Sequence, residues 1–277
     1  MPTGFGVAMD LIAAVIFGII QGITEWFPVS STGHLVLAQE LMHVPASESV
    51  LFDLILHAAT LLSVTVFLRK ELAEIVRSML SKKGSLDPSG VASRRLGWLA
   101  LLATIPALMT GLLLSRYLEE VFAPGATAVA LLVTGVMLWF AEMPRLRKER
   151  SDIGVRDALI IGLFQSAAVI PGISRSGSSI ASGCYLGFRR QLVAVFSFIL
   201  SVPLIIAALA YGSVSLDNTQ IEIVPTAIAA IVTFVVGLLA LKLLFSMIQK
   251  FKLRLFSIYC WAVGIIVLCL VGVQGIA

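Results

Sequence analysis

Two polar turns inside otherwise apolar segments carry most of the residues whose chemistry stands out. The first turn lies within the stretch QGITEWFPVSSTGH, which runs from Gln21 to His34. Gln21 and Glu25 are spaced i,i+4, so their side chains share one face of a helix. The Ser-Ser-Thr-Gly run that follows can cap a second helix, whose free N–H groups and positive dipole end attract an anion. The first turn therefore predicts an anion site beside a carboxylate.

The second turn reads PGISRSGSS and spans residues 171–179. It places Arg175 between Ser174 and Ser176, with Gly177 next, at the start of another predicted helix. The planar fork of a guanidinium matches phosphate oxygens, and glycine lets the backbone approach a ligand closely. Together the two turns predict a site for a phosphate or a diphosphate.

Each of these features also has a simpler explanation. Serine, threonine and glycine turns in membrane helices often serve only close packing and capping. A charged residue at the centre of a membrane helix costs about 2.5 to 3.5 kcal/mol, and such residues are kept mainly where they pair or face water. Glu25 and Arg175 therefore favour a functional site, although a purely structural ion pair between them would also explain their presence. His34 can act on a proton or a phosphate oxygen, or simply anchor the chain after the turn.

Two further pairs of residues have a structural explanation first. Asp53 and His57 share a helix face at i,i+4 spacing, and we expect a packing or interface pair rather than catalytic residues. Trp26 and Phe27 adjoin the first turn. We expect them to anchor the chain at the membrane interface, where aromatic side chains are enriched, with contact to a lipid tail as the alternative.

The composition places the chain in a bilayer. Of its 277 residues, 58% are hydrophobic and only 13% are charged, whereas soluble domains have about 25% charged residues. The mean hydropathy is +1.00. The formal net charge of +4 comes from basic residues in short clusters between apolar segments, which indicates membrane topology rather than nucleic-acid binding. The three cysteines show no paired or metal-binding spacing, so we expect them to pack as small apolar residues.

We expect six helices to cross the membrane, because a crossing needs roughly 20 apolar residues and lipid offers the backbone no hydrogen-bond partners. The basic clusters should be cytoplasmic, and the loops with Glu119, Glu120, Asp217 and Glu222 should face outward. Both termini would then lie outside. The predicted spans are roughly Val50–Leu68, Leu96–Leu114, Ala126–Phe140, Leu192–Tyr211, Val224–Met247 and Phe256–Gly275.

The two segments with the polar turns, 11–42 and 158–188, do not fit as simple crossings. Each has two short apolar arms around its turn, which predicts a re-entrant helical hairpin. In both, a Gly-x-x-Gln motif precedes a glycine by the same interval, and three predicted spans follow. The odd number of crossings would invert the second copy, as in proteins built from inverted repeats. The sequence therefore predicts one all-α integral membrane domain over 1–277, with repeats at 7–143 and 155–277.

The Gln21-x3-Glu25 pair, the PVSSTGH stretch and the PGISRSG stretch resemble the two signatures of bacitracin-resistance-type undecaprenyl-diphosphate phosphatases, and the resemblance extends along the whole chain. It implies hydrolysis of a polyprenyl diphosphate lipid to its monophosphate at the outer face of the cell (inner) membrane. This reaction recycles the carrier lipid for peptidoglycan synthesis. The resemblance also implies a divalent metal, Mg²⁺ or Ca²⁺, and a homodimer.

The resemblance also implies roles for individual residues. Ser31 corresponds to the proposed nucleophile, and Glu25, His34 and Arg175 correspond to the other catalytic residues. Glu25 and Gln21 match the metal-binding pair, but many members have Glu at the first position. Gln21 can ligate a hard cation through its amide oxygen but cannot act as a base. The implied substrate-binding residues are Ser30, Thr32, Ser174, Ser176 and Gly177.

Two other functions compete with this one. A lipid phosphatase with a histidine nucleophile would need a histidine six residues after Arg175, where this sequence has Ala181, and no histidine follows His57. That route is therefore excluded. A transporter or flippase for an anionic lipid or a small anion would use the same hairpins without hydrolysis, because a fold does not decide its function. Release of inorganic phosphate that EDTA abolishes would distinguish the enzyme from the transporter.

Overall fold

The computed structural model describes residues 11–42, 44, 46–82, 85–114, 123–143, 149–214, 222–250 and 253–274. The regular elements in these ranges are helices, and an isolated β-bridge joins Arg150 to Phe188. The predicted all-α fold is therefore confirmed for this part of the chain. Glu119, Glu120 and Asp217, from which we predicted outward loops, lie outside the described residues.

The helices in the described ranges are α1 (Leu11–Thr24), α2 (Ser31–Leu41), α3 (Ala46–Phe67), α4 (Arg69–Leu80), α5 (Pro88–Leu114), α7 (Pro124–Phe140), α8 (Val155–Ser166), the 3-10 turn η3 (Ala167–Val169), α9 (Arg175–Tyr185), α10 (Arg190–Val214), α11 (Ile223–Lys250) and α12 (Arg254–Gln274).

The described helices include four that are long and apolar enough to cross a membrane, namely α5, α10, α11 and α12, or five spans if the bent pair α3 and α4 counts as one. The four helices correspond to the predicted spans that begin at Leu96, Leu192, Val224 and Phe256. Helix α7 is apolar but has only 17 residues, fewer than the roughly 20 of a typical crossing. The chain is thus a multi-pass membrane protein, and the total of six crossings stays a prediction.

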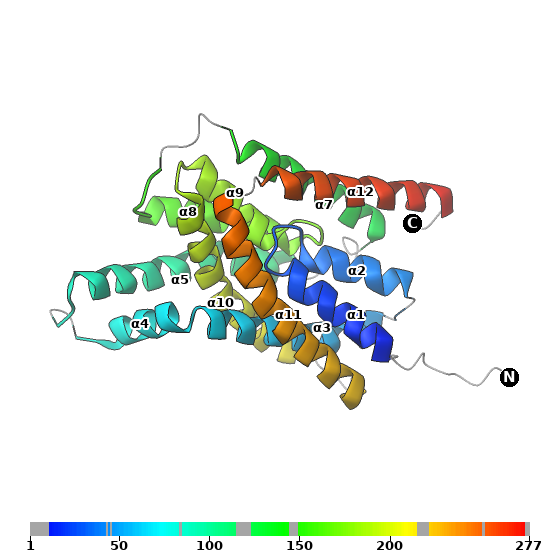
Figure 1. Ribbon diagram of the computed structural model, residues 1–277, viewed down its shortest axis with the longest axis horizontal. Helices are drawn as coiled ribbons and strands as arrows, with labels where there is room; N and C mark the ends of the chain where they lie inside the picture. The colour runs from blue at the N-terminus through cyan, green and yellow to red at the C-terminus, as the bar shows by residue number, and fades with distance from the viewer. Residues whose placement is uncertain are drawn as a thin grey trace.

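The chain bends sharply at Leu68, where α3 and α4 meet at 84°. Helix α3 is apolar, whereas α4 reads RKELAEIVRSML and has one charged face and one apolar face. The apolar face of α4 packs on α5 beside Gly97, where an added Cβ would lie 2.6 Å from Sδ of Met79 and 2.7 Å from Cγ2 of Ile75. Helix α4 and the first half of α5 form the projection at the left of Figure 1.

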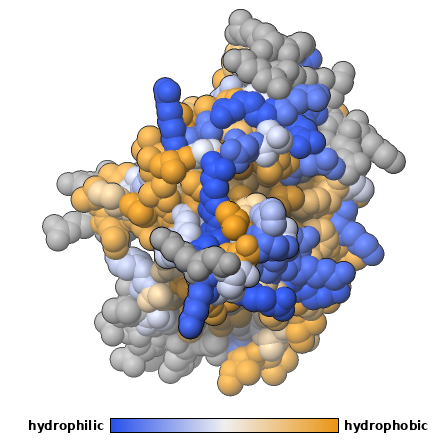
Figure 2. All heavy atoms as spheres, turned by 90° about the vertical axis from the view of Figure 1, so that its left-hand side faces the viewer, coloured by the Kyte–Doolittle hydropathy of each residue, from blue (hydrophilic) through white to orange (hydrophobic). Residues whose placement is uncertain are grey.

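The end of the molecule that carries α4 is strongly hydrophilic. Figure 2, which looks onto this end, shows hydrophilic side chains with apolar surface around them. Arg95 Nη1 lies 2.8 Å from Asp152 Oδ1, and Arg150 Nη2 lies 2.9 Å from Asp157 Oδ2. Asp157 also accepts a hydrogen bond from the N–H of Gly154 at 2.9 Å. These contacts fix the start of α8, and with it the entry of the second hairpin.

Helices α1 and α2 form the first helical hairpin, and α8 and α9 form the second. Figure 1 shows the turns of both near the centre, with α1 and α2 extending to one side and α8 and α9 to the other. The turns touch backbone to backbone, since a Cβ on Gly33 would lie 2.9 Å from Cα of Gly172. Helix α1 also packs closely on α11, because a Cβ on Gly18 would lie 2.7 Å from the carbonyl oxygen of Ala229. The fold therefore brings the two polar turns together in its interior.

Candidate active site

Ser30 holds the first turn in shape and joins it to the second. It is the N-cap of α2, and its side-chain oxygen accepts hydrogen bonds from the N–H groups of Gly33 at 3.3 Å and Gly172 at 3.1 Å. Its φ of 71° is rare for a residue other than glycine, and such strain is concentrated at functional sites. The same hydroxyl thus caps a helix of the first hairpin and positions the turn of the second.

The second turn is built in the same way and is held by α7. Ser174 is the N-cap of α9, and its side chain accepts a hydrogen bond from the N–H of Gly177 at 3.0 Å. The Thr134 hydroxyl of α7 accepts from the N–H of Ser174 at 3.0 Å and donates to the carbonyl of Gly172 at 2.8 Å. The second turn is therefore fixed by hydrogen bonds to both α2 and α7.

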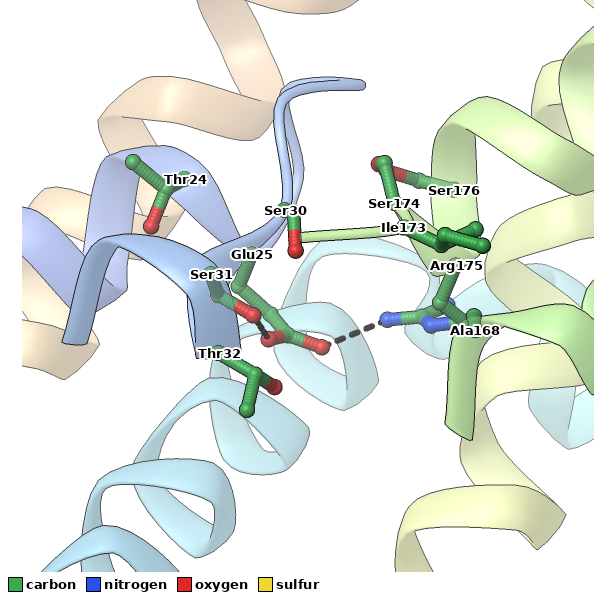
Figure 3. A pocket seen from close by; sticks show the side chains of 10 residues that line it. All are labelled: Thr24, Glu25, Ser30, Ser31, Thr32, Ala168, Ile173, Ser174, Arg175 and Ser176. Atoms are coloured by element: carbon green, nitrogen blue, oxygen red, sulfur yellow. Dashed lines mark hydrogen bonds and ion pairs between the residues drawn. The ribbon is translucent and has the colours of Figure 1, made fainter. Parts of the chain in front are cut away.

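The Glu25 carboxylate lies where the two turns meet. Its Oε1 accepts from Arg175 Nη2 at 2.6 Å, and its Oε2 accepts from Ser31 Oγ at 2.5 Å, as Figure 3 shows. Gln21, one helical turn earlier on α1, donates to Oε2 from Nε2 at 3.1 Å. Only 6% of Glu25 is exposed, so these contacts take the place of water around its charge. The prediction that the two turns bring Glu25 and Arg175 together is confirmed.

The Arg175 guanidinium still has a donor to offer. Its Nη2 binds Glu25, whereas its buried Nη1 has no hydrogen-bond partner among the described residues. A buried donor without a partner costs about 1 to 3 kcal/mol, which an anionic ligand would recover. A purely structural ion pair would leave this donor unused. The guanidinium therefore favours a binding role over a structural pair.

The expectation for Trp26 was wrong. Its side chain is fully buried instead of facing the membrane interface. The indole N–H donates to Ser63 Oγ at 3.2 Å, and the ring packs edge to face on Phe198 with a centroid distance of 5.5 Å. The Arg175 guanidinium lies over the indole, 5.8 Å from the ring centroid. Trp26 thus forms a packed wall that helps to hold Arg175 in place.

A small cavity of about 30 Å³ lies between the two turns and is lined by residues of both (Figure 3). Ser176 fixes one wall of the cavity, because its hydroxyl donates a hydrogen bond to the carbonyl of Phe27 at 3.2 Å. The cavity has room for one or two water molecules but not for a diphosphate. A ligand of that size therefore requires the Glu25–Arg175 pair or the turns to open. The lining includes four of the predicted substrate-binding residues, Ser30, Thr32, Ser174 and Ser176.

The oxygen atoms of Glu25 and Gln21 could serve as ligands of a divalent cation, provided that a bound phosphate supplies further ligands. Within the described ranges, no group of three His, Cys, Asp or Glu side chains could hold a metal ion. Glu25 offers one carboxylate, and Gln21 offers Oε1, which is buried without a hydrogen-bond partner among the described residues. Mg²⁺ is commonly held by one or two carboxylates, with water and substrate phosphates as its other ligands. Glu25 and Gln21 suit such an ion, although they do not enclose it.

His34 is turned toward α12 and does not line the cavity. Its Nδ1 lies 2.7 Å from the carbonyl oxygen of Ser30, and its Nε2 lies 2.9 Å from the hydroxyl of Tyr259. The two rings are stacked with their centroids 5.6 Å apart. The contact with Ser30 matches the anchoring role that we considered for His34, and its catalytic role stays a prediction.

His57 is a residue that sequence reasoning did not place at this site, and Thr134 is another. We expected a packing or interface pair with Asp53; its Nδ1 does lie 2.7 Å from the Asp53 carbonyl oxygen, and its Nε2 also lies 3.7 Å from Oε2 of Glu25. The i,i+4 spacing identified a shared helix face but not the helix opposite it. The available signal was the histidine itself, because an ionisable residue inside a predicted span usually faces the protein interior or a watery site.

These features define a class of protein. It is an integral membrane protein, helical throughout the described ranges, with an acid–arginine pair and two capped helix starts around an internal cavity. The family model described as "Bacitracin resistance protein BacA" matches residues 14–266, and the chain belongs to this family.

Several relatives match over nearly their whole length. An undecaprenyl-diphosphatase of Methanobrevibacter smithii is 36% identical over 278 aligned residues, covering 94% of this chain and 97% of the relative. An undecaprenyl-diphosphatase of Korarchaeum cryptofilum is also 36% identical, over 95% of this chain and 100% of the relative. The undecaprenyl-diphosphatase 1 of Halalkalibacterium halodurans is 36% identical, over 95% of this chain and 97% of the relative.

Proposed function

We propose that this protein converts undecaprenyl diphosphate to undecaprenyl phosphate and inorganic phosphate. The observation that carries the proposal is the convergence of Arg175 and Glu25 at 2.6 Å, with Arg175 Nη1 left without a partner among the described residues. Relatives named undecaprenyl-diphosphatase support the choice of substrate. In a cell membrane this reaction recycles the carrier lipid for peptidoglycan synthesis and confers resistance to bacitracin.

Substrate binding begins at the Arg175 guanidinium. The terminal phosphate takes the place of the Glu25 carboxylate at Nη2 and also accepts from Nη1, in the bidentate geometry that arginine offers. The first turns of α2 and α9 border the same cavity and contribute their positive dipole ends. Opening of the ion pair therefore both binds the phosphate and frees Glu25 for chemistry. The residues that shape the phosphate site are Ser30, Thr32, Ser174, Ser176 and Gly177.

Ser31 is placed to attack the terminal phosphorus. Its Oγ donates to Glu25 Oε2 at 2.5 Å, so Glu25 can accept the hydroxyl proton as the new P–O bond forms. The bond from phosphorus to the bridging oxygen breaks, undecaprenyl phosphate leaves, and water then releases inorganic phosphate from Ser31. In the alternative, a water molecule attacks directly and Glu25 takes its proton. In both routes Arg175 neutralises the charge on the phosphoryl oxygens.

A divalent cation, Mg²⁺ or Ca²⁺, belongs to this proposal as a cofactor. Glu25 and Gln21 would hold it, and its charge would offset that of the diphosphate. The Gln21 amide cannot act as a base, so Glu25 is the residue that takes up the proton. His34 contributes by holding the carbonyl of Ser30, beside the attacking residue.

The proposal includes a membrane topology. Six helices cross, namely α3, α5, α7, α10, α11 and α12, and the two hairpins are re-entrant and related as an inverted repeat. Its support is that Ser30 and Ser174 cap equivalent helices, with Gly33 and Gly177 at equivalent positions. The positive-inside rule puts the hydrophilic end seen in Figure 2 in the cytoplasm. The first hairpin then enters from outside, the site opens outward, and both termini lie outside. The protein acts as a homodimer in the inner membrane.

The test is phosphate release by purified protein in lipid vesicles that contain undecaprenyl diphosphate. We expect inorganic phosphate to accumulate, to stop when EDTA is added, and to resume when Mg²⁺ or Ca²⁺ is returned. The same vesicles report whether a labelled polyprenyl phosphate lipid moves between leaflets. Lipid movement without any phosphate release would contradict the proposal and support a transporter.

A further inference from the structure

His57 approaches Glu25 from α3 with one ring nitrogen already fixed. Its Nδ1 lies 2.7 Å from the backbone carbonyl oxygen of Asp53. Because a carbonyl oxygen can only accept a hydrogen bond, Nδ1 carries a proton, and Nε2 of the neutral ring has a free lone pair. The side chain is 26% exposed, so it is not sealed inside the protein.

The free nitrogen faces an oxygen that is also an acceptor. Nε2 of His57 lies 3.7 Å from Oε2 of Glu25, too far for a direct hydrogen bond. Oε2 already accepts from Ser31 and Gln21, and a proton or a cation between it and Nε2 would make this third approach attractive. Two ligand atoms at right angles on one ion lie about 2.9 Å apart for Mg²⁺ and about 3.3 to 3.7 Å apart for Ca²⁺. The observed separation of 3.7 Å lies at the upper end of that range.

The surroundings of His57 are those of a metal ligand. A histidine that binds a metal nearly always donates its other ring N–H to a carbonyl or a carboxylate, as Nδ1 does here to Asp53. The Asp53 side chain is held in turn by Gln39, whose Nε2 donates to Oδ1 at 2.9 Å. Gln21 donates from Nε2 to Glu25 Oε2, and the other atom of its amide, the buried Oε1, has no partner among the described residues and so is left for an ion.

We propose that His57 Nε2 is a protein ligand of the divalent ion, together with Glu25 and Gln21. This set joins one imidazole nitrogen to two oxygen donors. Mg²⁺ and Ca²⁺ prefer oxygen ligands, whereas imidazole raises the affinity for first-row transition ions. His57 should therefore contribute more to the binding of an ion such as Mn²⁺ than to the binding of Mg²⁺ or Ca²⁺. The inference deepens the proposed function and rests on it for the use of the ion.

The test is Mn²⁺ binding to the purified full-length protein, followed by EPR without any substrate. Replacement His57→Gln exchanges the nitrogen donor for an oxygen donor of similar reach. We expect it to weaken Mn²⁺ binding roughly tenfold or more, while Mg²⁺ affinity, measured by competition, changes less than about threefold. His34→Gln is the matched control, because both ring nitrogens of His34 have partners, and it should leave Mn²⁺ affinity within about twofold of wild type.

Pulsed EPR on the wild-type protein tests the inference directly, because its result does not depend on whether a variant folds. Pulsed EPR of Mn²⁺ bound to the wild-type protein should show the coupling of a directly bound nitrogen, and His57→Gln should lose it. Absence of this coupling in wild type would overturn the inference and leave His57 as an ion-pair partner of Glu25. Because binding and phosphate release are measured separately, hydrolysis with no nitrogen ligand would refute only this inference. Nitrogen-bound Mn²⁺ without hydrolysis would refute only the proposed function.

Discussion

The two turns share a backbone design but differ in the side chains that they present. In each, a serine caps a helix and accepts from the glycine three residues later, as Ser30 does with Gly33 and Ser174 with Gly177. The residue directly after the cap is neutral in the first turn and cationic in the second. The second hairpin also has an apolar residue, Val169, at the position that corresponds to Glu25.

This difference shows how one scaffold can build a polar site with two complementary halves. Two equivalent carboxylates would repel each other, and two arginines would leave uncompensated charge in the membrane. With one of each, Ser31 and Arg175 meet the same carboxylate from equivalent helix positions. The comparison predicts that changes to the charged side chains affect activity, whereas changes to the shared backbone design affect stability.

The largest effect is expected for Arg175→Ala. Loss of the guanidinium removes the group that binds the phosphate and leaves Glu25 without its closest cation, so kcat should fall about 10³-fold or more. The measurement is phosphate release by purified protein. Arg95→Ala is the control, because Arg95 forms an exposed ion pair with Asp152 at the hydrophilic end. Near-normal turnover in Arg175→Ala would refute the assignment of this residue.

Glu25→Gln should have the next largest effect. The amide keeps the shape of the side chain but cannot accept a proton from Ser31, so kcat should fall on the order of 10²- to 10³-fold. Phosphate release across the pH range checks this, with the melting temperature as the control for folding. If the variant folds and keeps wild-type turnover, Glu25 is not the base.

Ser31→Ala separates the two routes of attack. If Ser31 forms the new P–O bond, the variant should lose about 10³-fold or more in kcat, and rapid quenching of the wild type should trap phosphate on the protein. If water attacks, the loss should stay near tenfold, since only a hydrogen bond to Glu25 disappears. Ser213→Ala, on an exposed part of α10, is the matched control.

Gly33→Ala tests the contact between the turns. The added Cβ would lie 2.9 Å from Cα and 3.0 Å from N of Gly172, and neither backbone atom can move aside easily. We expect a loss of about 1 to 3 kcal/mol in unfolding free energy, measured in detergent. Gly111→Ala is the control, because nothing lies within 4 Å of its added Cβ in the last turn of α5. That variant should gain about 0.5 to 1 kcal/mol, and equal behaviour of the two would contradict the close approach.

The smallest effects are expected from the two caps. Ser30→Ala and Ser174→Ala should each cost about 1 kcal/mol in unfolding free energy. Ser30→Ala should cost more, because Ser30 also accepts from the N–H of Gly172 and so joins the two hairpins. Parallel chemical denaturation of both variants checks the order. A larger loss for Ser174→Ala would mean that the contact between the hairpins contributes little.

Features that depend on neighbours along the chain could be predicted from the sequence. Hydropathy predicted the helices α5, α10, α11 and α12, because a segment in lipid must satisfy its backbone internally. Turn chemistry predicted that the Ser-Ser-Thr-Gly run caps a helix, as Ser30 does, and that another helix starts at the second turn, as α9 does. The cost of burying Glu25 and Arg175 in a membrane predicted that they would meet, as they do.

Features that depend on which surfaces face each other could not be predicted in this way. Trp26 was expected at the membrane interface but is buried against Phe198. His57 was expected to pair along its own helix, and it does contact Asp53, but its approach to Glu25 on α1 was not predicted. Thr134 of α7 had no local signal for its contacts with the second turn.

The sequence by itself determined that this is a helical membrane protein and where its two polar turns lie. It also showed which side chains in the turns cost so much free energy to bury in a membrane that a role is expected for them. Only the tertiary structure decided that the turns share hydrogen bonds and that His57, Trp26 and Thr134 surround them. The physical reason is that capping and hydropathy act over a few residues. The choice of opposing helix faces depends instead on how closely backbones can approach at glycines such as Gly18 and Gly33.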